Sequence, residues 1–145
     1  MSEQLPPNGN EQANQPVRIK IPRRKPLMTP ILIGVSVFVF ILQLLIETFT
    51  GTDMLFVYGG KINSLIKAGQ FWRLITPVLL HGSILHLVLN MYALYILGRR
   101  MERFYGHSRF LLLYLLSGFA GNVLSFVLTS APSLGASTAI FGLFS

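Results

Sequence analysis

Two histidines and an asparagine lie close together in one of the most apolar stretches of the chain. His81, His86 and Asn90 belong to the segment HGSILHLVLN, which is followed directly by MYALYIL. In a helix, His86 and Asn90 stand at positions i and i+4 and therefore share one face. Because an unpaired polar side chain in hydrocarbon costs several kcal/mol, these side chains need hydrogen-bond partners or a chemical role.

A serine further along the sequence supplies a candidate nucleophile. Ser137 stands at the predicted start of a helix, where free backbone N–H groups and the positive dipole end favour a developing oxyanion. Gly135 permits a tight entry and a close approach of substrate. A hydroxyl, an imidazole and an amide are the parts of an acyl-transfer site, in which His86 could serve as the base. The simpler alternatives are a helix cap for Ser137 and interhelical hydrogen bonds for His86 and Asn90.

The sequence argues against a metal site and against catalysis by a cysteine thiol. His81 and His86 are five residues apart, which puts them on different sides of a helix, and no third ligand is evident. The chain has no cysteine, which excludes disulfides and thiol catalysis. We therefore predict a site without a metal or other cofactor.

The composition is that of a membrane protein. Hydrophobic residues make up 52% of the 145 residues and charged residues only 12%, whereas soluble domains are about 25% charged. The net charge of +7 comes from short clusters beside apolar runs, a pattern typical of membrane topology and anionic lipid. No basic stripe alternates with aromatic residues, so a nucleic-acid partner is excluded.

The hydropathy pattern predicts an all-α polytopic membrane protein. Residues 1–26 are polar and proline-containing, which indicates a disordered tail. A span needs about 20 apolar residues, and residues 50–80 read instead as a structured loop with short helices. The predicted spans are residues 30–49, 83–98 and 110–128, with a fourth beginning near residue 137.

Charge clusters orient these spans. Arg23, Arg24 and Lys25 precede the first span, and Arg99, Arg100 and Arg103 follow the second. The positive-inside rule puts both clusters, the tail and the N-terminus in the cytoplasm. The second and fourth spans then start on the same outer side, so Ser137 and His86 are expected at similar depth.

Small residues at intervals of four predict close helix packing. Glu102 lies within one such pattern and is expected to pair with the adjacent arginines. The two patterns are Gly98-x3-Glu102-x3-Gly106 and Ser117-x3-Gly121-x3-Ser125.

Taken together, the motifs resemble the rhomboid family of intramembrane serine proteases. They occur in the family's order and at its spacings, over roughly residues 50–145. The matching motifs are Trp72-Arg73, His81-x4-His86-x3-Asn90, Gly98-x3-Glu102-x3-Gly106 and Gly135-Ala136-Ser137.

The resemblance implies a rhomboid-like helical bundle that cleaves transmembrane protein substrates near the membrane surface. Ser137 is then the nucleophile of a serine endopeptidase, and His86 and Asn90 are oxyanion donors. His86 is thus reassigned from base to donor, because the family's base comes from a later helix. Residues implied to support the site are His81, Gly135, Phe141, Arg73 and Glu102.

Under this resemblance residues 27–145 form a partial rhomboid domain, with three full spans and the start of a fourth. No histidine follows His107, so the catalytic base and the last two helices are expected to be missing by C-terminal truncation. Thr138 stands where the family commonly has glycine, which implies altered packing. The expected location is a bacterial-type plasma membrane, as a multi-pass protein.

Three outcomes remain open for a chain of this kind. The leading one is an intramembrane protease whose 145-residue fragment is inactive alone. The alternative is a non-catalytic rhomboid-like protein that binds transmembrane clients, against which the joint presence of Ser137, His86 and Asn90 argues. An unstable isolated fragment is the third, because half a helix exposes backbone groups that lipid cannot satisfy.

Overall fold

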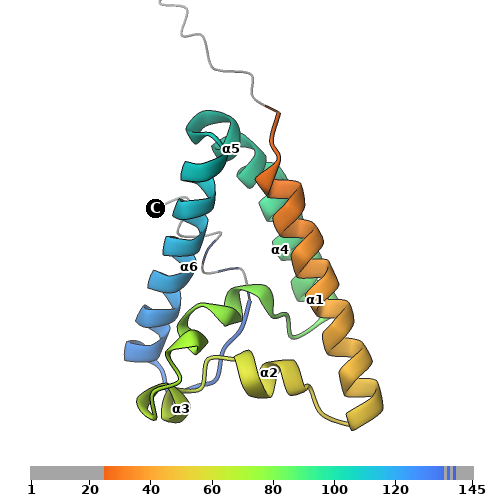
Figure 1. Cartoon of the computed structure of the whole chain (residues 1–145), viewed down its shortest axis with the longest axis vertical. Helices are drawn as coiled ribbons and strands as arrows, with labels where there is room; N and C mark the ends of the chain where they lie inside the picture. Colours follow the sequence, from red (N-terminus) through yellow and green to blue (C-terminus); the bar gives the residue numbers. More distant parts are fainter. Residues whose placement is uncertain (1–24, 136, 138, 140–145) are drawn as a thin grey trace, which may run out of the picture.

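The structure, a computed structural model, describes residues 25–135 together with Ser137 and Ala139. In these residues all regular secondary structure is helical, apart from one isolated antiparallel bridge between Lys61 and Ser133. The predicted all-α class is therefore confirmed for the described part of the chain. Figure 1 shows α1 and α6 as two long, splayed helices, with the short helices of the first loop gathered between them at one end.

The first long helix, α1, spans Met28–Thr50 and buries a narrow, mainly polar stripe of residues against the protein. Gly51 ends it in a left-handed conformation with φ of 70°, and its N–H donates to the Glu47 carbonyl, a common helix C-cap. The other side of α1 is apolar and exposed; the Phe38 side chain, for example, is 61% accessible. The buried residues are Thr29, Ser36, Phe40 and Gln43.

The second helical stretch runs without a break through α4 (Ile84–Ala93), the π-helical η4 (Leu94–Gly98) and α5 (Arg99–Tyr105). It includes the helix predicted over residues 83–98. Gly106, with φ of 81°, then turns the chain into α6 (His107–Leu128). Within the described residues, α1 and α6 are each long and apolar enough to cross a membrane.

Short helices fill the loop between α1 and α4, as predicted. The buried Arg73 guanidinium holds this loop together, because it donates to the carbonyls of Gly60 and Val57 at 2.8 and 2.7 Å. The Trp72 indole N–H donates to the Tyr58 carbonyl at 3.1 Å. The helices are α2 (Met54–Gly59), α3 (Asn63–Lys67), η2 (Phe71–Leu74) and η3 (Thr76–Leu79).

A hydrophobic core joins the long helices, and Gly118 of α6 packs closely against it. A Cβ at Gly118 would stand 2.6 Å from Val78 Cγ2 and 3.2 Å from Ala139 Cβ. The closest packing of α6 is therefore one position away from the predicted ridge, whose members Ser117, Gly121 and Ser125 are only half-buried. The buried stripe of α6 is Phe110, Tyr114, Gly118 and Asn122.

Glu102 ties the end of α5 to the beginning of α1. Its buried carboxylate accepts the backbone N–H groups of Leu27, Met28 and Thr29 at 2.6–2.8 Å, and the Thr29 hydroxyl at 2.7 Å. The His107 Nδ1 atom lies 2.5 Å away. The predicted pairing with adjacent arginines is wrong, because the carboxylate points into the protein, where the unpaired N–H groups of a helix start attract an anion.

These contacts change the acidity of Glu102, which lies between the predicted spans. Burial by itself would raise its pKa, but the hydrogen bonds from Thr29, His107 and Met28 outweigh burial and lower the pKa to about 2. The carboxylate is therefore ionised at neutral pH and acts as the N-terminal anchor of α1.

Candidate active site

The helix α4 begins at the polar residues of the candidate site. Ser83 is its N-cap, and the Ser83 hydroxyl accepts the His86 backbone N–H at 3.1 Å, which satisfies one of the free donors of the first turn. His86 lies in that first turn and Asn90 one turn later. The Asn90 side chain is buried, and its Nδ2 group has no acceptor in the described part of the chain.

His81 lies directly before this helix and is held by its backbone. The buried Gln43 amide accepts the His81 N–H at 3.1 Å and donates to the His81 carbonyl at 3.3 Å. The His81 ring stands edge-on between two neighbours, with its centroid 5.4 Å from that of His86 and 6.5 Å from that of Phe40. His81 therefore forms part of the wall against which the His86 imidazole rests.

Gly135 brings the serine segment onto His86. A Cβ at Gly135 would stand 2.5 Å from His86 Cε1 and 2.7 Å from Nε2, so only a residue without a side chain fits. Gly135 also has φ of 118°, a conformation that favours glycine, and its N–H donates to the Pro77 carbonyl at 2.8 Å. Two residues later Ser137 is helical and half-buried, and Ala139 is fully buried in the core.

Of the eight predicted site residues, His86 contacts both His81 and Gly135. Asn90 lies one turn after His86 on α4, and Ser137 follows Gly135 by two residues. Arg73 lies in the adjacent loop, whereas Glu102 belongs to the opposite end of the α4–α5 helix. Phe141 lies outside the described residues. Among the described residues no group of three or more His, Cys, Asp and Glu side chains could hold a metal ion.

Sequence reasoning missed Lys61, which positions the segment that leads to Ser137. The Lys61 ammonium is buried and donates to the carbonyls of Ser125, Thr129 and Ala131 at 2.8–3.0 Å. Lys61 also forms a two-way backbone bridge with Ser133, with N···O distances of 3.1 and 3.2 Å. Burial lowers the pKa of Lys61. One residue therefore closes the end of α6 and fixes the strand-like stretch before Gly135.

No local signal distinguishes Lys61 in the sequence, since a lysine after two glycines in a loop is normally solvated. Its three acceptors are 64, 68 and 70 residues away along the chain. Only the tertiary structure shows that these carbonyls, which lie in the last turn of α6 and in the loop after it, converge on one ammonium.

Comparison with known proteins decides the family. The family model described as the Rhomboid domain matches residues 68–145, which is more than half of the chain and includes the whole candidate site. The chain belongs to the rhomboid family. The resemblance seen in the motifs is thereby confirmed.

Several relatives of this rhomboid are named as proteases. The "Rhomboid protease GluP" of Bacillus subtilis (strain 168) is 46% identical over 118 residues, covering 81% of this chain and 23% of that protein. The "Rhomboid-like protease 3" of Toxoplasma gondii is 48% identical over 75 residues, or 51% and 28% of the two chains. The "RHOMBOID-like protein 9, chloroplastic" of Arabidopsis thaliana is 45% identical over 87 residues, or 60% and 20%. The chain thus spans about a quarter of the length of these relatives.

Proposed function

We propose that this rhomboid is an intramembrane serine endopeptidase that hydrolyses peptide bonds of transmembrane protein substrates. Ser137 is the nucleophile in this proposal, and His86 and Asn90 are the oxyanion donors. The observation that carries it is the contact of Gly135 with the His86 imidazole, which brings the Gly-x-Ser segment to the polar face of α4.

The chemistry assigns each group one task. The Ser137 hydroxyl oxygen attacks the scissile carbonyl, and a histidine from a later helix of the family takes its proton and delivers it to the leaving amine. The negative charge on the carbonyl oxygen is stabilised by the His86 ring, the Asn90 amide and the Ser137 backbone N–H. Water then hydrolyses the acyl-enzyme. The 145-residue chain alone, which has no histidine after His107, is inactive in this proposal.

The buried Asn90 amide supports the donor assignment. A buried N–H group normally has an acceptor, because leaving it unpaired costs roughly 1–3 kcal/mol. Asn90 Nδ2 has none among the described residues, so the site holds a ready donor. An oxyanion that forms in the transition state would satisfy it, and would be preferred over the neutral carbonyl of the ground state.

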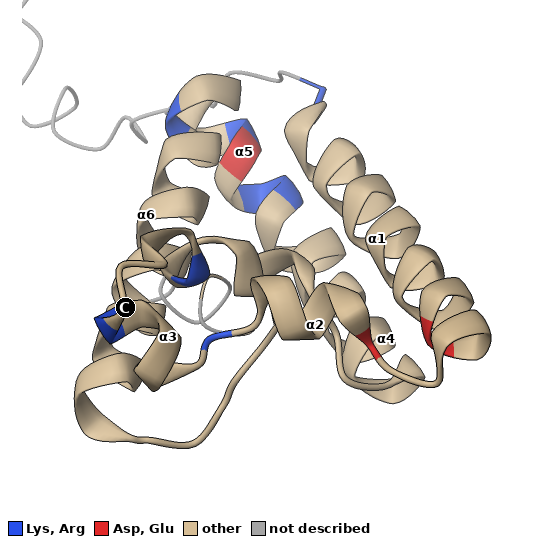
Figure 2. Cartoon of the chain, turned by 60° about the horizontal axis from the view of Figure 1, so that its bottom comes forward, with Lys and Arg blue, Asp and Glu red and all other residues tan. Residues whose placement is uncertain are grey.

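The distribution of charge supports a cytoplasmic N-terminus. For the described part of the chain, Figure 2 shows basic residues gathered around α5 at one end, beside the acidic position of α5, and other acidic positions near the far end of α1. At that other end, Lys61 and Arg73 are buried in backbone contacts, and Lys67 of α3 is exposed. The α5 end would face the cytoplasm and the site the outer side. The cations at the α5 end are Lys25, Arg99, Arg100, Arg103 and Arg109.

Exposed apolar side chains support three spans in a lipid bilayer. Large hydrophobic residues cover the outer faces of α1, α4 and α6; Val127 and Leu85, for instance, are 71% and 68% accessible. Such continuous apolar surface is normal for a protein in hydrocarbon or for a face that further helices cover. We assign residues 83–98, which include α4 and η4, as the second span and place this rhomboid in a bacterial-type plasma membrane.

The decisive test compares Ser137→Ala with Ser130→Ala in the full-length gene product. Cleavage of a reporter transmembrane helix in proteoliposomes should fall by on the order of 10⁴-fold or more for Ser137→Ala. Ser130 is exposed in the loop after α6, so Ser130→Ala should cleave normally. Persistent cleavage by Ser137→Ala would reject Ser137 as the nucleophile.

Fluorophosphonate labelling separates this function from a non-catalytic, client-binding rhomboid. The reagent forms a covalent bond only with a serine that a competent base activates. Labelling of the wild type that is lost in Ser137→Ala supports the protease, whereas a properly inserted but unlabelled protein favours client binding. Translation of the coding sequence beyond Ser145 is an independent check, because the protease requires a later histidine.

A further inference from the structure

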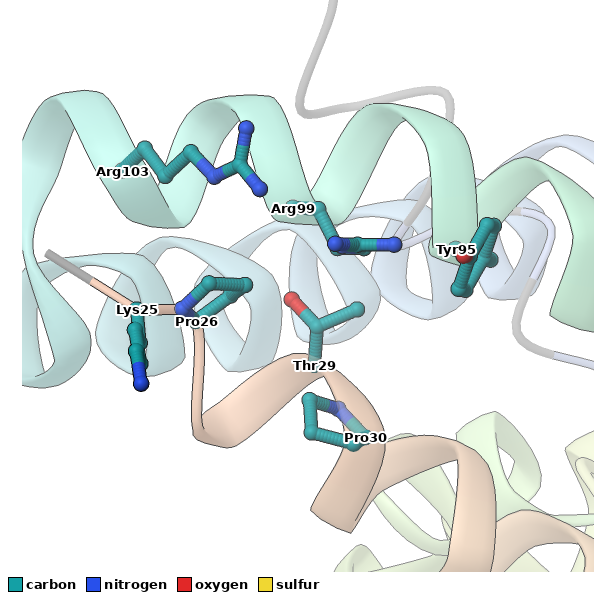
Figure 3. Close-up of a pocket in the computed structure, with 7 residues that line it drawn as sticks. All are labelled: Lys25, Pro26, Thr29, Pro30, Tyr95, Arg99 and Arg103. Atoms are coloured by element: carbon teal, nitrogen blue, oxygen red, sulfur yellow. The ribbon is translucent and has the colours of Figure 1, made fainter. Parts of the chain in front are cut away.

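A basic cleft lies at the opposite end of the molecule from the candidate active site. Its volume is about 750 Å³, and it lies between the start of α1 and the η4–α5 part of the second helical stretch. Figure 3 shows Tyr95, Arg99 and Arg103 along that stretch, across from the beginning of α1. The lining residues are Lys25, Pro26, Thr29, Pro30, Tyr95, Arg99 and Arg103.

The cleft carries an excess of positive charge. Three of its seven lining side chains are cationic and none is acidic. The nearby Glu102 carboxylate does not neutralise them, because it is fully buried and occupied by the start of α1 and by His107. That contact with His107 is the only close contact between a basic and an acidic side chain within the described residues.

Helical spacing places the cleft's two arginines and its tyrosine on one stripe. Tyr95, Arg99 and Arg103 stand at i, i+4 and i+8 and therefore point from the same face. The Arg99 guanidinium lies 4.6 Å above the centre of the Tyr95 ring, a cation–π contact that holds its plane and leaves its N–H edge available. A planar guanidinium edge matches two phosphate oxygens at once.

The remaining lining suits a lipid rather than a free ion. Pro26, Pro30 and Tyr95 give the cleft apolar walls, and exposed apolar side chains of α1, such as Ile31, begin directly below them. A phosphate at the arginines would therefore have its glycerol and acyl chains beside hydrophobic helix surface. Basic pockets between helices on the cytoplasmic side are a known mode of headgroup binding.

We propose that this cleft binds the phosphate headgroup of an anionic phospholipid of the cytoplasmic leaflet. Lys25, Arg99 and Arg103 hold the phosphate oxygens. A single lipid then bridges the start of α1 and the η4–α5 part of the second helical stretch. The assignment to the cytoplasmic leaflet rests on the orientation proposed above, whereas binding itself requires neither that orientation nor proteolysis.

Native mass spectrometry of the full-length gene product tests the cleft directly. The protein is released from vesicles of phosphatidylcholine and phosphatidylglycerol, and the retained lipids are counted. The wild type should retain phosphatidylglycerol in preference to phosphatidylcholine. Arg99→Gln/Arg103→Gln should weaken retention about 30-fold, because two guanidinium groups lose their charge-assisted hydrogen bonds to the phosphate.

The matched control is Arg100→Gln/Arg109→Gln, which removes the same charge at the same end but outside the cleft. This control should retain phosphatidylglycerol within about twofold or threefold of the wild type, because exposed charges outside the cleft are screened by salt and water. Equal loss in both double variants would mean that surface charge alone attracts the lipid, and would overturn the site. The single variant Arg103→Gln, at an exposed position, should give about a fivefold loss if the double variant fails to fold.

Inorganic phosphate separates a lipid site from a simple anion site. Millimolar phosphate should not displace the retained phosphatidylglycerol, because the apolar part of the cleft holds the glycerol and acyl chains. Displacement by phosphate, or equal retention of the two lipids by the wild type, would overturn the proposal. A cleavage-inactive Ser137→Ala protein should bind the lipid as the wild type does, which keeps this result separate from that of the proposed protease function.

Discussion

Gly135→Ala is the substitution for which the structure makes the sharpest prediction. The added Cβ would lie 2.5 Å from His86 Cε1 and 2.7 Å from Nε2, whereas non-bonded carbon atoms are comfortable at roughly 3.5–4.0 Å. The imidazole or the Gly135 backbone must therefore move by about 1 Å. A displacement of that size at a reacting group can reduce the rate about 100-fold.

Gly69→Ala is the matched control for the backbone. Gly69 has φ of 97°, close to the 118° of Gly135, but a Cβ there would meet no atom within 4 Å. Both substitutions force alanine into a positive-φ conformation, at about 1–3 kcal/mol of stability each. Only Gly135→Ala also pushes against His86, so the difference between the two variants isolates the contact.

The assay is the single-turnover rate of reporter cleavage by the full-length gene product, with the thermal unfolding midpoint measured in parallel. We expect similar losses of stability in the two variants, with a rate loss of about 100-fold confined to Gly135→Ala. A rate within about threefold of the wild type for Gly135→Ala would refute the reasoning. Equal rate losses in both variants would do so as well, because strain would then explain the effect without His86.

Three further outcomes follow from the contacts described. Lys61→Met should destabilise the protein by roughly 3 kcal/mol or more, because the carbonyls of Ser125, Thr129 and Ala131 each lose a hydrogen bond from a charged group; exposed Lys67→Met on α3 should be neutral, and equal unfolding midpoints of the two variants would contradict this. Glu102 has a folded pKa of about 2, below its ordinary value of 4.5, so its stabilising contribution of roughly 3 kcal/mol is complete above pH 4.5 and is lost as pH falls toward 2. Glu102→Gln should therefore have a lower free energy of unfolding than the wild type at pH 7, and the two values should converge at pH 2. A constant difference between them across that range would refute the assignment. Asn90→Ala should reduce kcat by about 100-fold to 1000-fold with little change in KM, and a change in KM alone would exclude an oxyanion role.

Local patterns in the sequence determined much of the architecture. Hydrophobic runs of helical length mark α1 and α6, and the polar residues His86 and Asn90 share one helical face because positions four apart always do. The four motifs that include Trp72-Arg73, the histidines, Glu102 and Gly-x-Ser indicated the family together, through their order and spacing. These inferences depend on periodicity and spacing along the chain, which the sequence displays directly.

Only the tertiary structure decided which distant groups meet. Glu102 accepts backbone N–H groups up to 75 residues away rather than the adjacent arginines, and Lys61 closes the end of α6 from a loop more than 60 residues earlier. The closest packing of α6 falls on Gly118 because Val78 and Ala139 lie there. The contact between Gly135 and His86 is likewise visible only in the tertiary structure. Long-range partners depend on how helices pack, and unpaired backbone groups at helix ends recruit whichever side chain that packing brings to them.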